Sequence, residues 1–188
     1  MSGTSFSVAL IHHPVYDKNR QVVTTAVTNL DIHDIARAAR TFGADRYYIV
    51  TPVTEQQAMV SRIVSHWQDG WGATYNPKRK AALDLVTVAP SLEAVRQEMT
   101  RRFGQEPKIV VTGATGRHGS VTTAQLAPRI AAGGDNYLLL FGTGWGMTEE
   151  IFAAADLVLE PIAGCGDYNH LSVRSAVSIY MDRLFGRR

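Results

Sequence analysis

The stretch of the chain that decides its fold is Leu159-Glu-Pro-Ile-Ala-Gly-Cys-Gly-Asp-Tyr-Asn-His-Leu-Ser-Val-Arg-Ser-Ala176. The apolar run from Leu157 to Leu159 predicts a short buried strand, which Pro161 ends. A loop rich in glycine and polar residues follows, and a helix is expected to begin near Ser172. Because open α/β sheets bind ligands beyond the carboxyl ends of their strands, this loop is predicted to hold a ligand.

Strands and helices alternate along the rest of the chain. Strands are predicted at residues 8–11, 47–50, 85–88, 108–112 and 137–141, with helices between most of them. Asn29 or Asp31 is expected to cap the helix that ends near residue 43, and Thr54 with Gln57 suggests a capping box. Residues 71–76 are expected to form a loop. This alternation predicts an α/β fold with a parallel sheet covered by helices on both faces.

The composition is that of an ordinary globular protein. With 188 residues, 45% hydrophobic and 19% charged, residues 1–188 are predicted to form a single domain. Because no long apolar run occurs and Met1 to Phe6 lack a signal-peptide pattern, we expect a cytoplasmic protein without a membrane partner. The single cysteine, Cys165, excludes an internal disulfide and a cysteine-based zinc cluster, and no metal is expected. The net charge of +2 is weak support for a nucleic-acid partner.

A second glycine-rich segment, Thr112 to Gly119, fits the TGxxGxxG form of the dinucleotide-binding fingerprint. That fingerprint would indicate an NAD(P)-dependent reductase. Such a site also needs an acidic or basic side chain at the end of the next strand, to meet the ribose of the dinucleotide. Here that strand ends with Phe141-Gly142-Thr143 and has no such side chain, which counts against a dinucleotide site. The alternative is that three strand ends, Thr112 to Gly116, Phe141 to Gly146 and Glu160 to Ser172, converge, so that backbone groups bind a flat heterocycle.

Motifs in the last third of the chain resemble those of a known class. Phe141-Gly-Thr-Gly-Trp-Gly-Met147, Pro161-Ile-Ala-Gly164 and Tyr168-Asn-His-Leu-Ser-Val-Arg-Ser-Ala176 are similar to the carboxyl-terminal motifs of the SPOUT class of S-adenosylmethionine (SAM)-dependent RNA methyltransferases. The segment from Asn29 to Gly43 resembles the class's amino-terminal motif, in which an asparagine precedes a helix that carries an arginine. The resemblance spans about Val8 to Leu184. It implies a Rossmann-like parallel sheet flanked by helices with a C-terminal deep trefoil knot, which pattern alone would not predict.

The resemblance also implies the residues of the site. Arg37, Asn169 and His170 would be catalytic. The guanidinium of Arg37 would bind phosphate or stabilise a developing oxyanion, and the imidazole of His170 could take a proton from a nucleobase nitrogen. Ile162 and Leu171 would sandwich the adenine of the cofactor. The implied cofactor-binding residues are Thr112, Gly113, Ala114, Phe141, Gly142, Thr143, Gly144, Gly146, Ile162, Gly164, Asn169, Leu171 and Ser172.

The function implied is transfer of a methyl group from SAM to a ribose 2′-oxygen or a base nitrogen of tRNA or rRNA. Two alternatives stay open: a catalytically silent protein of the same fold that binds cofactor or RNA, and an NAD(P)-dependent reductase that uses Thr112 to Gly119. The class also implies a homodimer in which the partner subunit completes the substrate site, with Arg37 facing the donor pocket from the partner. The closing helix carries a surplus apolar face, which usually means either such an interface or a thick core. That face carries Val173, Val177, Tyr180, Met181 and Leu184.

Overall fold

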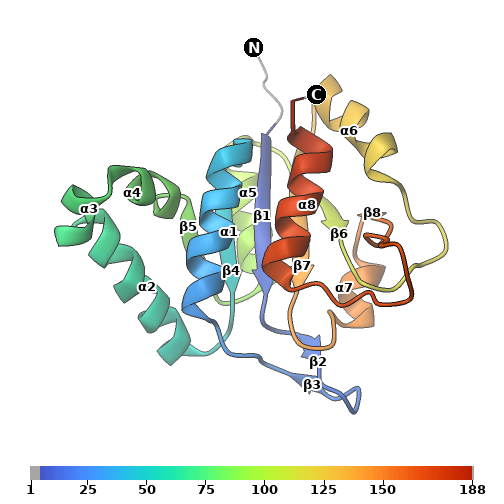
Figure 1. Cartoon of the computed structure of the whole chain (residues 1–188), viewed down its shortest axis with the longest axis horizontal. Helices are drawn as coiled ribbons and strands as arrows, with labels where there is room; N and C mark the ends of the chain where they lie inside the picture. Colours follow the sequence, from blue (N-terminus) through green and yellow to red (C-terminus); the bar gives the residue numbers. More distant parts are fainter. Residues whose placement is uncertain (1–4, 188) are drawn as a thin grey trace.

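The computed structural model describes residues 5–187 of the chain. Its centre is a six-stranded parallel sheet in the order β5-β4-β1-β7-β6-β8, with the small antiparallel hairpin β2-β3 below it in Figure 1. The strands are β1 (Ser5–Ile11), β2 (Val15–Tyr16), β3 (Val22–Val23), β4 (Arg46–Val50), β5 (Val86–Ala89), β6 (Lys108–Val111), β7 (Asn136–Gly142) and β8 (Leu157–Val158).

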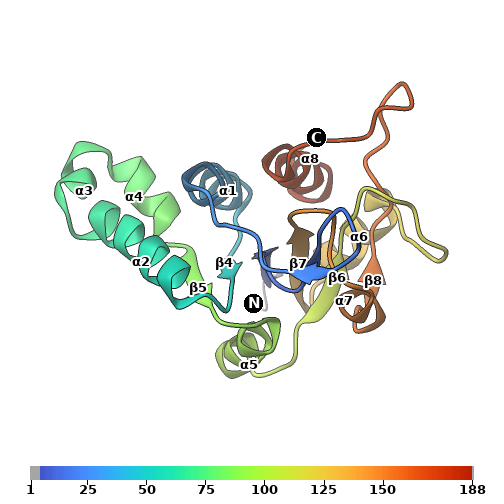
Figure 2. The ribbon, with the colours of Figure 1, turned by 90° about the horizontal axis from the view of Figure 1, so that it is seen from below.

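Helices cover both faces of the sheet, as Figure 2 shows from below. The helices are α1 (Asn29–Phe42), α2 (Thr54–Gln68), α3 (Trp71–Tyr75), α4 (Pro77–Leu83), α5 (Leu92–Phe103), α6 (Thr123–Ala132), α7 (Glu149–Ala153) and α8 (Val173–Phe185). One core cluster joins α1, α2, α4, α6 and α8 to the first face of the sheet, and a second cluster joins α5 and α7 to the other face. Because both faces are covered, the central strands read as continuous apolar runs instead of alternating patterns.

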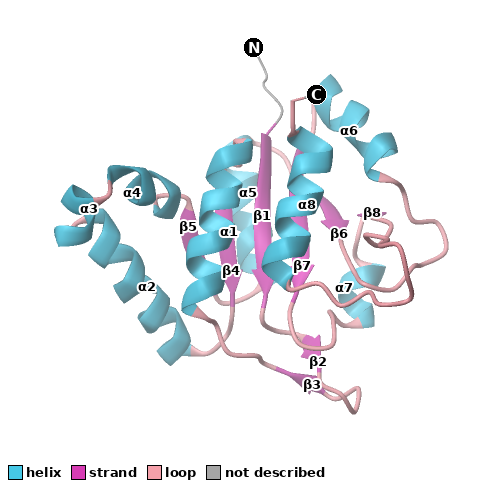
Figure 3. Cartoon of the chain, in the orientation of Figure 1, coloured by secondary structure: helices cyan, strands magenta, loops and turns pink. Residues whose placement is uncertain are grey.

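The strand order changes direction between β1 and β7. From β1 the chain steps to β4 and then to β5, whereas β7, β6 and β8 occupy the other side of β1. Ligands of open α/β sheets bind at such a switch point, beyond the carboxyl ends of the strands. The loops after β6, β7 and β8 gather at this edge, at the lower right of Figure 3. The fold therefore brings together the three segments that the sequence singled out.

The first long helix is capped by a residue that the sequence prediction did not name. Thr28 precedes α1, and its Oγ1 accepts a hydrogen bond from the backbone N–H of Asp31 at 3.2 Å. Asn29 and Asp31 both lie inside the helix, so neither of them is the cap. The predicted end of this helix is confirmed, because Gly43 adopts a left-handed backbone with φ of 80°.

Two local predictions for the second helical region were wrong. Thr54 and Gln57 form no capping box, since the side chain of Gln57 donates instead to the carbonyl of Thr51 at 2.7 Å. Residues 71–75 form the short helix α3 and not a loop. The indole of Trp67 lies so close to Gly72 that an added Cβ would come within 2.8 Å of the ring, and this packing holds α3 against α2.

The predicted class is confirmed as an α/β fold with a parallel sheet flanked by helices. The closing helix α8 returns to lie beside α1, as Figure 1 shows. Its residues Val177, Tyr180, Met181 and Leu184 are buried in the core of the same chain. The apolar face of this helix therefore belongs to the core, which is one of the two explanations that the sequence left open. The trefoil knot stays a prediction.

Candidate active site

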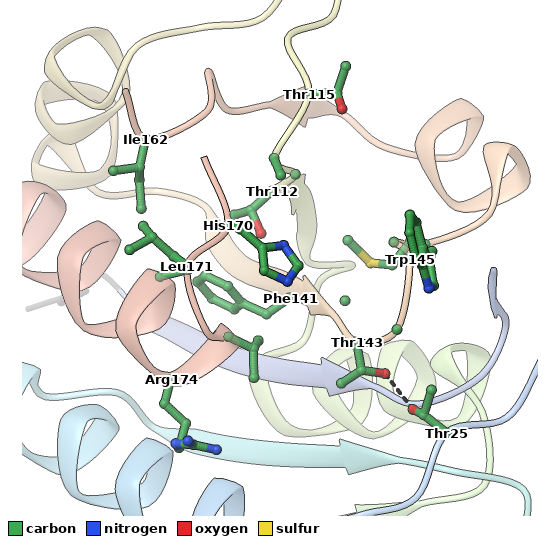
Figure 4. Close-up of a pocket in the computed structure, with 18 of the residues that line it drawn as sticks. Thr25, Thr112, Thr115, Phe141, Thr143, Trp145, Ile162, His170, Leu171 and Arg174 are labelled. Atoms are coloured by element: carbon green, nitrogen blue, oxygen red, sulfur yellow. Dashed lines mark hydrogen bonds between the residues drawn. The ribbon is translucent and has the colours of Figure 1, made fainter. Parts of the chain in front are cut away.

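The loops after β6, β7 and β8 enclose a cavity of about 780 Å³, shown in Figure 4. That volume is within the range of about 300 to 1,000 Å³ that is usual for small-molecule sites. The cavity wall is completed by the segment before α1 and by the first two turns of α8. The cavity therefore lies at the switch point of the sheet, in the loops where a ligand site was predicted from the sequence.

Most of the residues predicted to bind the cofactor line this cavity. They are Thr112, Gly113, Ala114, Phe141, Gly142, Thr143, Gly144, Gly146, Ile162, Asn169 and Leu171. Gly164 and Ser172 belong to the same loop but lie outside the lining. Ser172 instead caps α8, because its Oγ accepts from the backbone N–H of Ser175 at 3.2 Å.

The loop after β7 is held against the β2-β3 hairpin by its backbone. The N–H of Trp145 donates to the carbonyl of Tyr16 at 2.9 Å, and the N–H of Tyr16 donates to the carbonyl of Gly146 at 2.8 Å. Gly144 has a φ of +58°, and a Cβ there would approach the carbonyl of Tyr16 to 2.9 Å. Gly146 has a φ of +101°, but a Cβ there would meet nothing within 4 Å. Glycine at these positions lets the backbone form one wall of the cavity.

A chain of hydrogen bonds joins this loop to a buried histidine. The hydroxyl of Thr143 donates to the carbonyl of Ile11 at 2.9 Å, so the hydroxyl of Thr25 must donate to Thr143, at 2.5 Å (Figure 4). The Oγ1 of Thr25 then accepts from Nδ1 of His12, at 3.0 Å. Burial lowers the pKa of His12 to about 4, while Asp31 acts in the opposite sense. His12 is therefore neutral near pH 7, with its proton on Nδ1.

The predicted catalytic residues of the last loop are both at the cavity but differ in their surroundings. The amide Nδ2 of Asn169 donates to the carbonyl of Ala114 at 2.9 Å. This bond ties the loop after β8 to the loop after β6, so the amide has a clear structural role. His170 lines the cavity and is exposed, and its ring makes an edge contact with Tyr168.

Arg37, the third predicted catalytic residue, does not line the cavity of its own chain. It lies in the exposed part of α1. The cation that α8 places at the cavity is Arg174, whose guanidinium bonds Asp31 at 2.9 Å and approaches Asp34 to 3.6 Å. Asp31 is almost fully buried and also accepts from the hydroxyl of Thr28 at 2.5 Å. This ion pair joins the start of α1 to the start of α8.

Sequence reasoning did not identify several of the residues that line the cavity. They include Thr25, Asp31, Arg117, Trp145 and Arg174. The partners that position them lie far away in the sequence: Arg174 and Asp31 are 143 residues apart. No local pattern signals such a pair. Within residues 5–187, no group of three or more His, Cys, Asp or Glu side chains is placed to hold a metal ion, and no helix has the length and apolar character to cross a membrane.

The dinucleotide reading of Thr112 to Gly119 does not fit the local backbone. A dinucleotide fingerprint runs directly from a strand into a helix, whose N-terminus binds the pyrophosphate. Here β6 ends at Val111 and α6 begins only at Thr123, so a long loop separates them. Of the glycines in this segment, Gly113 lines the cavity, and none of them opens a helix.

An open parallel sheet with a cavity built from three strand-end loops is typical of α/β proteins that bind a small ligand at the switch point of the sheet. Residues 5–186 match the sequence model of a family described as SAM-dependent RNA methyltransferase. The chain belongs to this family. This confirms the predicted family, and with it the enzyme class and SAM as the cofactor.

Relatives and solved structures agree with this assignment. An uncharacterized protein of Aquifex aeolicus is 38% identical over 180 residues, which cover 96% of this chain and 88% of that protein. A tRNA (guanine-N(1)-)-methyltransferase of Oleidesulfovibrio alaskensis is 39% identical over 184 residues, 98% of this chain but only 43% of that protein. The chain thus spans less than half of this second relative.

Two solved structures share the fold at low sequence identity. The TrmJ structure from Z. mobilis ZM4 superposes with a TM-score of 0.61 at 18% identity, covering 98% of this chain and 69% of that one. The SpoU methyltransferase AviRb from Streptomyces viridochromogenes, in complex with the cofactor AdoMet, gives a TM-score of 0.61 at 16% identity, covering 98% and 58%.

Proposed function

We propose that this chain binds SAM in the cavity beyond β6, β7 and β8 and transfers its methyl group to a ribose 2′-oxygen or a base nitrogen of tRNA or rRNA. The observation that carries the proposal is the convergence of the three predicted loops on one cavity in a member of this family. Because the chain spans 43% of the relative named tRNA (guanine-N(1)-)-methyltransferase, we carry over methylation of RNA and not the guanine atom in that name.

The residues present fit the cofactor. A flat heterocycle can approach the backbone at Gly146, where a Cβ would meet nothing within 4 Å. Ile162 and Leu171 offer apolar surface for its faces, and both line the cavity. When bound, SAM supplies an electrophilic methyl group on a sulfonium. The protein's part is to hold donor and acceptor in line, which requires little covalent chemistry from its side chains.

We assign roles on the acceptor side to Arg37 and His170. The acceptor oxygen or nitrogen loses a proton when it gains the methyl group, and the exposed imidazole of His170 at the cavity can accept that proton. The guanidinium of Arg37 would bind phosphate or stabilise a developing oxyanion. Asn169 would position the donor loop through its bond to Ala114.

We further propose that the chain acts as a homodimer. Arg37 lies outside the cavity of its own chain, so an acceptor role requires that a second subunit present this residue. The outer face of α8 is polar, so the proposed dimer is inferred from the position of Arg37 and not from an exposed apolar surface. We also propose that residues 1–188 act as one domain and that the protein works in the cytoplasm.

The test is methyl transfer from tritiated SAM to RNA from a strain that lacks the gene. We expect label in tRNA or rRNA, and mass mapping of nucleosides would assign it to the ribose or the base. A methyl group on the ribose also blocks alkaline cleavage of the neighbouring bond, which gives an independent readout. Binding of SAM without transfer to any cellular RNA would favour the catalytically silent alternative.

A further inference from the structure

The mouth of the cavity presents an exposed tryptophan. The side chain of Trp145 lines the cavity, and the residue is 69% exposed. Figure 4 shows it on the side of the cavity away from Ile162 and Leu171. Large aromatic side chains usually bury most of their surface, so an indole left open beside a ligand cavity points to a binding role.

The backbone fixes the turn that carries this indole. Trp145 lies between Gly144 and Gly146, both with left-handed φ, and its own N–H is bonded to Tyr16. A second hydrogen bond, from the N–H of Tyr16 to the carbonyl of Gly146, also holds this turn against the β2-β3 hairpin. The ring is therefore presented on a preorganised turn, which reduces the entropy lost when a partner binds to it.

Two arginines lie on the same rim. Arg117 makes two bonds to the carboxylate of Glu149, at 2.6 and 2.8 Å, and Arg20 approaches the same carboxylate at 3.5 Å. Each guanidinium also lies over an aromatic ring, Arg117 at 3.6 Å from the centroid of Phe152 and Arg20 at 4.0 Å from that of Tyr16. The carboxylate of Glu149 therefore orients both guanidiniums at the same edge of the cavity.

The rim is assembled from three separate segments of the chain. Arg20 comes from the β2-β3 turn, where it has a φ of +63° that a non-glycine residue rarely adopts. Arg117 comes from the loop after β6, and Glu149 opens α7. The aromatic rings orient the guanidiniums, and their planar donors suit the oxygens of a phosphate.

We infer that this rim is the acceptor-nucleotide site: an unpaired base stacks on Trp145, and Arg20 and Arg117 bind its phosphate. The inference rests on the proposed function, because it names the form of RNA that the cavity takes. A base inside a helix cannot reach a donor at the bottom of a cavity, so the nucleotide must leave its stack. Stacking on an indole offsets part of the stacking energy that the nucleotide loses when it leaves the helix, and any of the four bases can stack in this way.

The competing explanations for the exposed indole are a wall of the cofactor site and a contact between subunits. A cofactor wall predicts that truncating Trp145 weakens binding of the cofactor. A subunit contact predicts that it changes the oligomeric state.

The test uses the full chain and a fluorescein-labelled, mixed-sequence single-stranded RNA 12-mer, with binding followed by anisotropy. Trp145→Ala is expected to weaken RNA binding about 5- to 150-fold, and Trp145→Phe should keep most of the affinity. The matched control is Trp71→Ala, because Trp71 is 71% exposed but lies on α3, away from the cavity. Arg20→Ala with Arg117→Ala should lower the slope of log affinity against log salt by about 1, whereas Arg101→Ala on α5 should not.

Calorimetry with S-adenosylhomocysteine and light scattering on the same variants separate the explanations. We expect cofactor affinity within about twofold of wild type and an unchanged oligomeric state. The inference is overturned if wild type does not bind the 12-mer, if Trp145→Ala and Trp71→Ala have equal effects, or if Trp145→Ala loses the cofactor or changes the assembly. Failure of wild type to bind S-adenosylhomocysteine would instead reject the proposed function.

Discussion

The buried histidine behind the cavity gives a quantitative prediction for stability against pH. The folded chain keeps the pKa of His12 near 4, because its imidazole is buried, and Nε2 has no hydrogen-bond partner among the described residues. In the unfolded chain the pKa returns to about 6.5. Between these values the unfolded state binds a proton that the folded state does not, so the free energy of unfolding falls as the pH falls. From pH 7.5 to pH 5, the loss from His12 alone is about 2 kcal/mol.

The assay is urea unfolding at pH 7.5 and pH 5, in wild type and in His12→Asn. The asparagine amide can donate to Thr25 as Nδ1 of His12 does, but it does not titrate. Subtracting the pH effect in the variant from that in wild type removes the contributions of the other histidines and the carboxylates. We expect a difference of about 2 kcal/mol.

Equal pH effects in the two proteins would refute the reasoning. If the variant does not fold, NMR titration of the His12 imidazole in wild type replaces the comparison. A midpoint near 4 supports the account, and a midpoint at 6 or above contradicts it.

Three further substitutions test the site. Gly144→Ala should weaken binding of S-adenosylhomocysteine more than about tenfold by calorimetry, because a left-handed backbone and a close carbonyl leave no room for the methyl group. Gly166→Ala, where a Cβ would meet nothing within 4 Å, should bind S-adenosylhomocysteine like wild type. Equal losses of affinity in the two variants would contradict the claim that the backbone at Gly144 forms a wall of the cavity. Arg174→Ala should lower the free energy of unfolding by about 3 kcal/mol, since it leaves the buried carboxylate of Asp31 without its cation; a loss below about 1 kcal/mol, as for an exposed pair, would show that this pair is not structural. Arg37→Ala should lower the rate of methyl transfer about 100-fold while the affinity for SAM stays nearly constant. Equal losses of rate and of SAM affinity would contradict a role of Arg37 on the acceptor side.

The sequence predicted the parts of the fold that depend on local pattern. The apolar runs of β1 and β7 and the helical spacing in α1 and α8 are properties of neighbouring residues, and the structure confirms them. The glycines after β6 and β7 also predicted where the backbone lines the cavity. The cap of α1 was missed because several polar residues there could serve, and only the folded turn selects Thr28.

The remaining features depend on contacts between distant segments. Arg20 reaches Glu149 across 129 residues, and His12 reaches the donor loop through two threonine hydroxyls. The catalytic role of Arg37 was predicted by resemblance alone, and its position outside the cavity could be seen only in the folded chain. Such pairings become visible only when the topology places the loops together.

The central claim is that the cavity beyond β6, β7 and β8 binds SAM, and calorimetry with S-adenosylhomocysteine tests it most directly. The account predicts saturable binding of one molecule per chain, and no binding of a reduced nicotinamide dinucleotide to the same protein. Absence of S-adenosylhomocysteine binding to a chain shown to be folded by circular dichroism would contradict it.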